Sequence, residues 1–171
     1  LTSFPDSAEA ATVNELIAEK GAIFPYILDT VTPIPESPSP DILIDKDGWF
    51  LVPEGVTECS FRGDTIILND RILIRIRKNG SESDIYSLLE SGPAFRARVT
   101  PTSTTGSPAV IDSIRIVENN PGAVEIATDF VAEQHTNTFA LRLTPASSIV
   151  ELIGMENVNS ISIRNNWEYV V

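Results

Sequence analysis

From Asp41 onward, apolar and polar residues alternate in short runs that are separated by turn residues. One of the clearest runs lies in residues 65–80, and such a period of two is typical of a strand with one buried face. Asn69-Asp70 precedes the alternation and Asn79-Gly80 follows it, so a turn is expected at each end. The alternating sets are Ile72, Ile74 and Ile76 on one side, and Leu73, Arg75 and Arg77 on the other.

Similar runs recur to the end of the chain, with Gly, Pro and Asn between them and no helical pattern interrupting them. This arrangement predicts a mainly β protein, an antiparallel β-sandwich. The expected strands are residues 49–52, 58–62, 65–68, 72–77, 85–89, 95–99, 114–117, 124–130, 139–143, 149–153, 160–163 and 167–171.

The first 40 residues have a different pattern. Residues 8–20 are helix formers with apolar residues on one face, and Gly21 is typical of a helix end. The apolar segment 23–28 requires burial, either on the sandwich or on a neighbouring chain. Residues 32–41 contain four prolines and predict an extended connector. The sequence thus divides into an N-terminal helical arm with a Pro-rich linker, residues 1–40, and a β-sandwich domain, residues 41–171.

Composition limits the possible partners. The 171 residues carry 12 basic and 24 acidic side chains, a net charge of −12. Nucleic acid is not expected as a partner, because phosphate contacts need clusters of Lys and Arg. No apolar run reaches about 18 residues, so no membrane span is expected. The chain starts at Leu1, and its last residues have a strand pattern; these features predict part of a larger protein or a homo-oligomer.

Arginine alternates with apolar residues in several expected strands. One interpretation is a basic platform that binds an acidic ligand, such as a uronate-bearing polysaccharide, through bidentate guanidinium contacts. The other interpretation is cross-strand pairing with carboxylates on a solvated face, which is the commoner arrangement. The arginines are Arg75, Arg77, Arg96, Arg98, Arg115 and Arg142, and the candidate carboxylates are Glu118, Glu125, Asp129 and Glu151.

Aromatic side chains provide a second set of candidate ligand-binding residues, because their flat faces can stack on sugar rings. Tryptophans in a sandwich are, however, more often part of the core. The main candidates are Trp49, Trp167 and Tyr169, with Tyr86 and Phe50 in addition.

Calcium is the only cofactor that the sequence suggests. Asp45 and Asp47 are alternate oxygen ligands followed by Gly48, which resembles part of a calcium loop. The remaining ligands of such a loop are absent, and an Asp-Gly turn explains the residues more simply. Arg62-Gly63-Asp64 matches an adhesive tripeptide, but it too is explained by a turn.

Catalytic chemistry has little support. His135 and Cys59 are the only histidine and cysteine, so the sequence shows no histidine-rich metal site and no evident Ser-His-Asp triad. An enzyme is therefore the least favoured class, although paired carboxylates cannot be identified from spacing in the sequence.

Two stretches together resemble a known family. They are Leu68-Asn69-Asp70-Arg71-Ile72-Leu73-Ile74-Arg75-Ile76 and Ile114-Arg115-Ile116-Val117-Glu118-Asn119-Asn120-Pro121-Gly122-Ala123-Val124-Glu125-Ile126. They resemble the β-supersandwich domains of bacterial carbohydrate-active proteins, including the N-terminal domains of some polysaccharide lyases. The resemblance implies a secreted or cell-surface location and an association with polysaccharide, and it carries over no catalytic residue.

Two functions are thus expected. The first is a noncatalytic, polysaccharide-binding β-sandwich module of an extracellular or cell-surface bacterial protein. The second is a structural subunit of an extracellular filament, sheath or surface layer, in which the N-terminal arm and edge strands bind neighbouring subunits.

Overall fold

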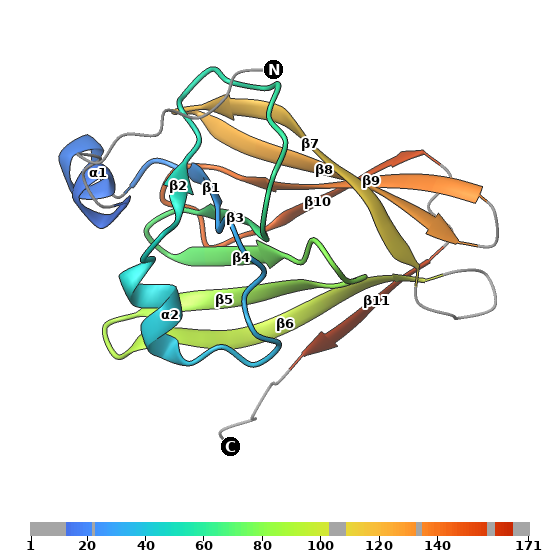
Figure 1. Ribbon diagram of the computed structural model, residues 1–171, viewed down its shortest axis with the longest axis horizontal. Coiled ribbons are helices and arrows are strands. Elements are labelled where there is room, and N and C mark those ends of the chain that lie inside the picture. Colours follow the sequence, from blue (N-terminus) through green and yellow to red (C-terminus); the bar gives the residue numbers. More distant parts are fainter. Residues whose placement is uncertain (1–12, 22, 103–108, 133–134, 157–159, 166–171) are drawn as a thin grey trace.

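The protein is a mainly β structure with two antiparallel sheets that pack together, which confirms the expected β-sandwich (Figure 1). The computed structural model describes residues 13–21, 23–102, 109–132, 135–156 and 160–165. The elements are α1 (Val13–Lys20), β1 (Tyr26–Asp29), α2 (Pro40–Asp45), β2 (Phe50–Leu51), β3 (Thr65–Leu68), β4 (Ile72–Ile76), β5 (Ser83–Leu89), β6 (Gly92–Thr102), β7 (Val110–Asn120), β8 (Ala123–Ala132), β9 (His135–Leu143), β10 (Glu151–Glu156) and β11 (Ser160–Asn165).

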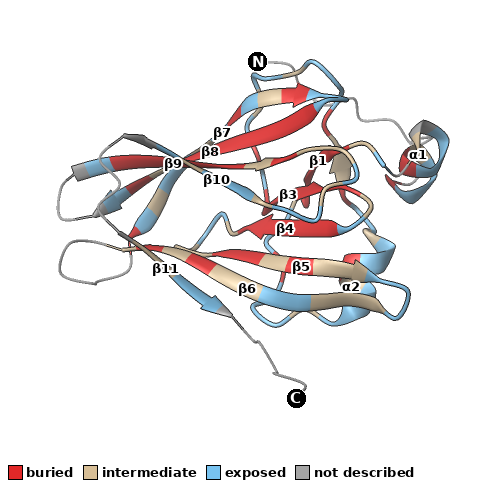
Figure 2. Ribbon diagram, turned by 180° about the vertical axis from the view of Figure 1, so that it is seen from behind, coloured by how far each residue is buried: buried red, intermediate tan, exposed pale blue. Residues whose placement is uncertain are grey.

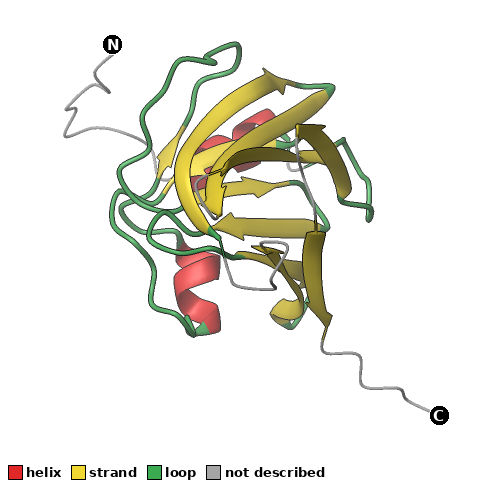
Figure 3. Cartoon of the chain, turned by 90° about the vertical axis from the view of Figure 1, so that its right-hand side faces the viewer, coloured by secondary structure: helices red, strands yellow, loops and turns green. Residues whose placement is uncertain are grey.

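The larger sheet has seven strands in the order β11-β6-β5-β4-β3-β1-β2, and the smaller sheet has four in the order β10-β9-β8-β7. The strands of both sheets curve around a shared interior (Figure 3). Ile67 and Ile74 from the larger sheet and Ile126 from the smaller are fully buried there. Phe130 and Phe139 meet edge to face, with ring centroids 5.7 Å apart. This is the main hydrophobic core.

A second hydrophobic core covers the opposite face of the larger sheet. Val13 and Ile17 of α1, Leu43 of α2 and Trp49 pack with strand residues such as Leu73. Consequently every residue of β4 is buried, as Figure 2 shows for the centre of the sheet. The expectation of one buried face for this strand was wrong, because the period of two does not reveal that N-terminal segments cover the second face.

The described residues of the N-terminal region belong largely to the same body. α1 ends as expected, since Gly21 has φ +94° and its N–H donates to Ile17 O at 3.0 Å. β1 pairs with β3 and with β2, so the apolar segment 23–28 is buried on the chain's own sheet although it falls within the expected arm. The expected helix residues 8–12 lie outside the described residues.

Two local expectations differ from the structure. Residues 40–45 form α2, which starts with Pro40; proline is favoured in the first turn of a helix, and the Pro-rich connector concealed this start. Residues 58–62 do not form a strand, although Phe61 is buried. The expected strand 167–171 lies outside the described residues. Among the described helices, none has the length and apolarity needed to cross a membrane.

Candidate functional site

Arg75 is a structural residue inside the molecule. Its side chain is 2% exposed and lies on the face of β4 that the second core covers, the same face as Leu73. Its Nε donates to Asp64 Oδ2 at 2.7 Å. The guanidinium also donates to the carbonyl oxygens of Ile34 and Pro35. Arg75 therefore holds the Pro-rich segment onto the sheet, and its donors are engaged within the chain.

Asp64 completes this buried pair. Its carboxylate also accepts hydrogen bonds from the backbone N–H of Ile34 and of Lys78, each at 3.1 Å. Asp64 is 1% exposed, so the Arg62-Gly63-Asp64 tripeptide does not present its carboxylate at the surface, and the adhesive interpretation has no support. The carboxylate joins three chain segments through charge-assisted hydrogen bonds.

Arg77 and Arg98 converge on a second buried carboxylate. Asp84 is fully buried, and it accepts from Arg77 Nη2 at 2.8 Å and from Arg98 Nε at 2.7 Å. Glu82 pairs with both arginines as well, at 2.9 and 3.4 Å. Burial would lower the pKa of Arg98, but the hydrogen bond and charge of Asp84 outweigh it and raise that pKa. Arg77 and Arg98, like Arg75, therefore form ion pairs within the chain.

The remaining arginines lie partly on the other sheet. Arg142 pairs with three carboxylates of the smaller sheet, at distances of 3.1–3.6 Å. Arg115 lies 3.5 Å from Asp129, and Arg96 is exposed and donates to Ser87 Oγ at 3.0 Å. The partners of Arg142 are Glu118, Glu125 and Glu151. The arginines therefore do not share one platform. Arg115 and Arg142 pair with carboxylates that the second interpretation named, whereas Arg75, Arg77 and Arg98 pair with the buried Asp64 and Asp84 and with Glu82, which it did not include.

The aromatic candidates are likewise dispersed. Trp49 is 8% exposed and packs in the second core, and Tyr86 is 7% exposed and meets Phe95 edge to face at 5.7 Å. The guanidinium of Arg62 lies 4.8 Å from the centre of the Phe50 ring. Trp167 and Tyr169 lie outside the described residues.

Asp45 and Asp47 are exposed, at the end of α2 and in the turn after it. Lys46 between them has φ 52°, Gly48 has φ 72°, and Trp49 N donates to Lys46 O at 3.1 Å, which is turn geometry. In the described part of the chain, no group of three or more His, Cys, Asp and Glu residues could hold a metal ion. Asp45 and Asp47 therefore belong to no such group among the described residues.

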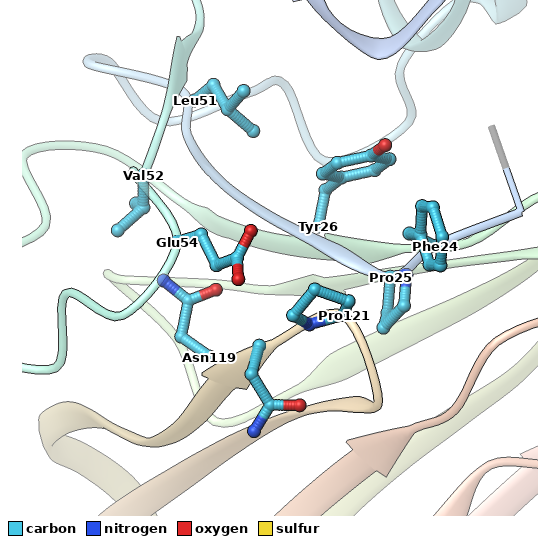
Figure 4. Close-up of a pocket in the computed structure, with 9 residues that line it drawn as sticks. Phe24, Pro25, Tyr26, Leu51, Val52, Glu54, Asn119 and Pro121 are labelled. Atoms are coloured by element: carbon cyan, nitrogen blue, oxygen red, sulfur yellow. The ribbon is translucent and has the colours of Figure 1, made fainter. Parts of the chain in front are cut away.

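A pocket of about 220 Å³ lies where the start of β1, the segment after β2 and the turn between β7 and β8 meet (Figure 4). The residues that line it come from three segments that are distant in the sequence, so no local pattern marks them as functional. It is lined by Phe24, Pro25, Tyr26, Leu51, Val52, Glu54, Asn119, Asn120 and Pro121.

Hydrogen bonds hold the walls of this pocket in place. Tyr26 donates its hydroxyl proton to Gly21 O at 2.7 Å, which fixes the ring. Asn119 Nδ2 donates to the carbonyl oxygens of Pro53 and Val56, at 2.8 and 3.1 Å, and so fixes the segment after β2. Asn120 Oδ1 accepts from two N–H groups of the β7–β8 turn. These hydrogen bonds fix the walls of the pocket through residues that are far apart in the sequence.

Glu54 gives the pocket its charge. The side chain is exposed, and among the described residues it has no hydrogen-bond or ion-pair partner; its carboxylate lies between the Tyr26 ring and Asn119 (Figure 4). Burial, and then the charge of Glu54, raise the pKa of Tyr26. The amide oxygen of Asn119 also accepts no hydrogen bond from the described residues. The pocket thus combines apolar rings with two open acceptors.

A second cavity, of about 430 Å³, is lined by residues that include Cys59, Lys78 and Ile114. Burial raises the pKa of the Cys59 thiol, which disfavours the reactive thiolate. Lys78 Nζ donates to the carbonyl oxygens of Phe61 and Arg62, at 2.6 and 3.0 Å. The side chain of His135 is not described. The thiol and the ammonium group of this cavity are therefore less available for chemistry or binding than the Glu54 carboxylate of the first pocket.

Comparisons of the chain with known protein families, with curated proteins and with solved structures found no match.

Proposed function

We propose that the chain is a noncatalytic β-sandwich module that binds carbohydrate in the pocket around Glu54, as part of a secreted or cell-surface protein. The supporting observation is the combination of the Phe24, Tyr26 and Pro121 rings with the open acceptors of Glu54 and Asn119. Sugars have apolar C–H faces, which stack on rings, and hydroxyl groups, which donate to such acceptors.

The dimensions of the pocket favour a single sugar residue. Its volume of about 220 Å³ is below the range of about 300–1,000 Å³ that is usual for drug-sized ligands. We therefore expect it to hold one ring of a polysaccharide, with the neighbouring rings outside. Among the described residues, the lining contains one carboxylate, whereas glycoside hydrolysis ordinarily uses two, so we propose binding rather than cleavage.

This proposal replaces the arginine platform as the place of binding. Arg75 is buried and bonded within the chain, and Arg77 and Arg98 share buried Asp84. An acidic sugar would have to compete with these internal carboxylates, whereas the acceptors of the pocket are open.

Replacing Glu54 by alanine is expected to weaken saccharide binding about tenfold, which corresponds to about 1.4 kcal/mol, because the ligand loses charge-assisted hydrogen bonds. Isothermal titration calorimetry with a panel of soluble oligosaccharides measures the affinity. Glu58→Ala is the matched control, since Glu58 is exposed and does not line the pocket. The absence of saccharide binding by the unaltered chain, or an equal loss in the control, would contradict the proposal.

The second candidate function, a structural subunit, has support from β11. This strand ends the seven-stranded sheet, and Ile163 on it is 62% exposed. Such an edge can add a strand from a second copy of the chain. Residues 13–20 and 26–29 pack on their own sheet, so this assembly would use the sheet edge and not the described part of the arm.

If β11 pairs with a second copy, Ile163→Lys is expected to shift the chain from dimer or larger species to monomer, because a charge in the new interface is costly. Sedimentation velocity over a range of concentrations measures the shift. Ile149→Lys is the control, since Ile149 is 69% exposed and lies outside the strands. A chain that stays monomeric at high concentration would exclude the structural role through this edge.

A further inference from the structure

We propose that the pocket around Glu54 selects a sugar with a free, protonated amine, a hexosamine, over neutral and acidic sugars. This inference rests on the proposed carbohydrate-binding function and specifies its ligand class. It differs from the uronate that the strand arginines suggest, because the charge at the pocket has the opposite sign.

The open polar groups of the pocket are mainly acceptors. Glu54 contributes a carboxylate that has no partner among the described residues. Asn119 contributes Oδ1, since its amide N–H groups bond to Pro53 O and Val56 O. The Tyr26 hydroxyl already donates to Gly21 O, and Asn120 Nδ2 donates to Glu118 Oε1 at 2.9 Å. An ammonium group has three donors and no acceptor, and therefore complements this set better than a hydroxyl does.

The rings of the pocket also favour a cation. Phe24 and Tyr26 form one wall, and Glu54 lies across from it (Figure 4). Aromatic faces attract a nearby cation by about 0.5–1 kcal/mol at exposed sites and more where water is excluded. A hexosamine can place its C–H face on a ring and its ammonium near the carboxylate at the same time.

None of the described residues that line the pocket is basic, so among them nothing offsets the charge of Glu54. Arg142, which is linked to Asn120 of the pocket through Glu118, shares its guanidinium among Glu118, Glu125 and Glu151. The hydrogen bonds of Asn120 and Arg142 and the charge of Arg142 lower the pKa of Glu118, although burial raises it. The lowered pKa favours the negatively charged form of Glu118. With a chain charge of −12, a uronate would meet repulsion here.

The test compares three oligosaccharides of equal length by isothermal titration calorimetry on the full chain: glucosamine oligomers, their N-acetylated forms and oligogalacturonates. N-acetylation converts the charged amine of each glucosamine unit into a neutral amide and leaves the sugar ring unchanged. We expect the free amine to bind about tenfold more tightly than the acetylated form, and the uronate to bind most weakly. Added salt is expected to reduce this preference.

Glu54→Gln keeps the size of the side chain and removes its charge. It is expected to abolish the preference for the amine, and Glu58→Gln is expected to leave the preference unchanged. Equal or tighter binding of the N-acetylated or uronate oligomer would overturn this inference and leave the proposed function intact. If no saccharide binds, both the proposed carbohydrate-binding function and the preference for a hexosamine are contradicted. If Nα-acetyl-lysine amide binds as tightly as the amine sugar, the pocket recognises the amine and the assignment to a sugar is overturned.

Discussion

Replacing Asp64 by alanine is expected to lower the free energy of unfolding by about 3–5 kcal/mol, the usual cost of breaking a buried ion pair. The variant leaves the Arg75 guanidinium, which is 2% exposed, without its charged partner. It also removes the acceptor of the Ile34 and Lys78 N–H groups. Urea denaturation followed by fluorescence measures the change, because buried Trp49 reports on the second core.

Arg115→Ala is the matched control for this prediction. Arg115 is 51% exposed and lies 3.5 Å from Asp129, so its removal is expected to cost only about 0–1 kcal/mol. Combining Asp64→Ala with Arg75→Met removes both charges, and the loss is expected to be smaller than the sum of the two single losses. Additive losses, or an Asp64→Ala loss no greater than that of Arg115→Ala, would contradict the role of this pair.

Replacing Gly63 by alanine is expected to lower the free energy of unfolding by about 3 kcal/mol or more. Overpacking usually costs about 1–3 kcal/mol, and this substitution is expected at or above the upper end of that range. A Cβ atom at this position would press on Thr30 Oγ1 and lie 2.6 and 2.7 Å from the N and O atoms of Thr32. Thr30 Oγ1 cannot move freely, because it donates to Thr32 O and accepts from Asp64 N, both at 2.7 Å. Thermal and urea denaturation measure the loss.

Two variants make the Gly63 result interpretable. Gly154→Ala is the control, since a Cβ there has no neighbour within 4 Å, and its effect on the free energy of unfolding is expected to be small. Thr30→Ala combined with Gly63→Ala removes the side-chain contact but leaves the Thr32 backbone in place. Full recovery in this double variant, or no loss in Gly63→Ala, would show that the close approach of the two backbones is not required.

The buried carboxylates explain why the Pro-rich segment is part of the body of the protein. Fully buried Asp29 accepts from the backbone N–H groups of Val31, Arg62 and Gly63, at 2.9–3.2 Å. Asp64 and Arg75 add the bonds to Ile34 and Pro35. Asp29 thus fixes the chain just before the Pro-rich segment, and the side chains of Asp64 and Arg75 supply partners for backbone groups within it.

Some features depend only on neighbouring residues: the period of two in β4, the apolar face of α1, the glycine with positive φ after α1, and the Asn-Pro-Gly turn between β7 and β8. The sequence alone therefore determined the antiparallel β-sandwich and many of its turns. The position of β1, the burial of both faces of β4 and the pocket around Glu54 depend on segments that meet only in the folded chain. Arg75 illustrates the difference: its alternation was visible in the sequence, but its carbonyl partners lie 40 and 41 residues away. Only the tertiary structure could decide whether that charge faces a ligand or the interior, because contacts over such separations leave no local pattern.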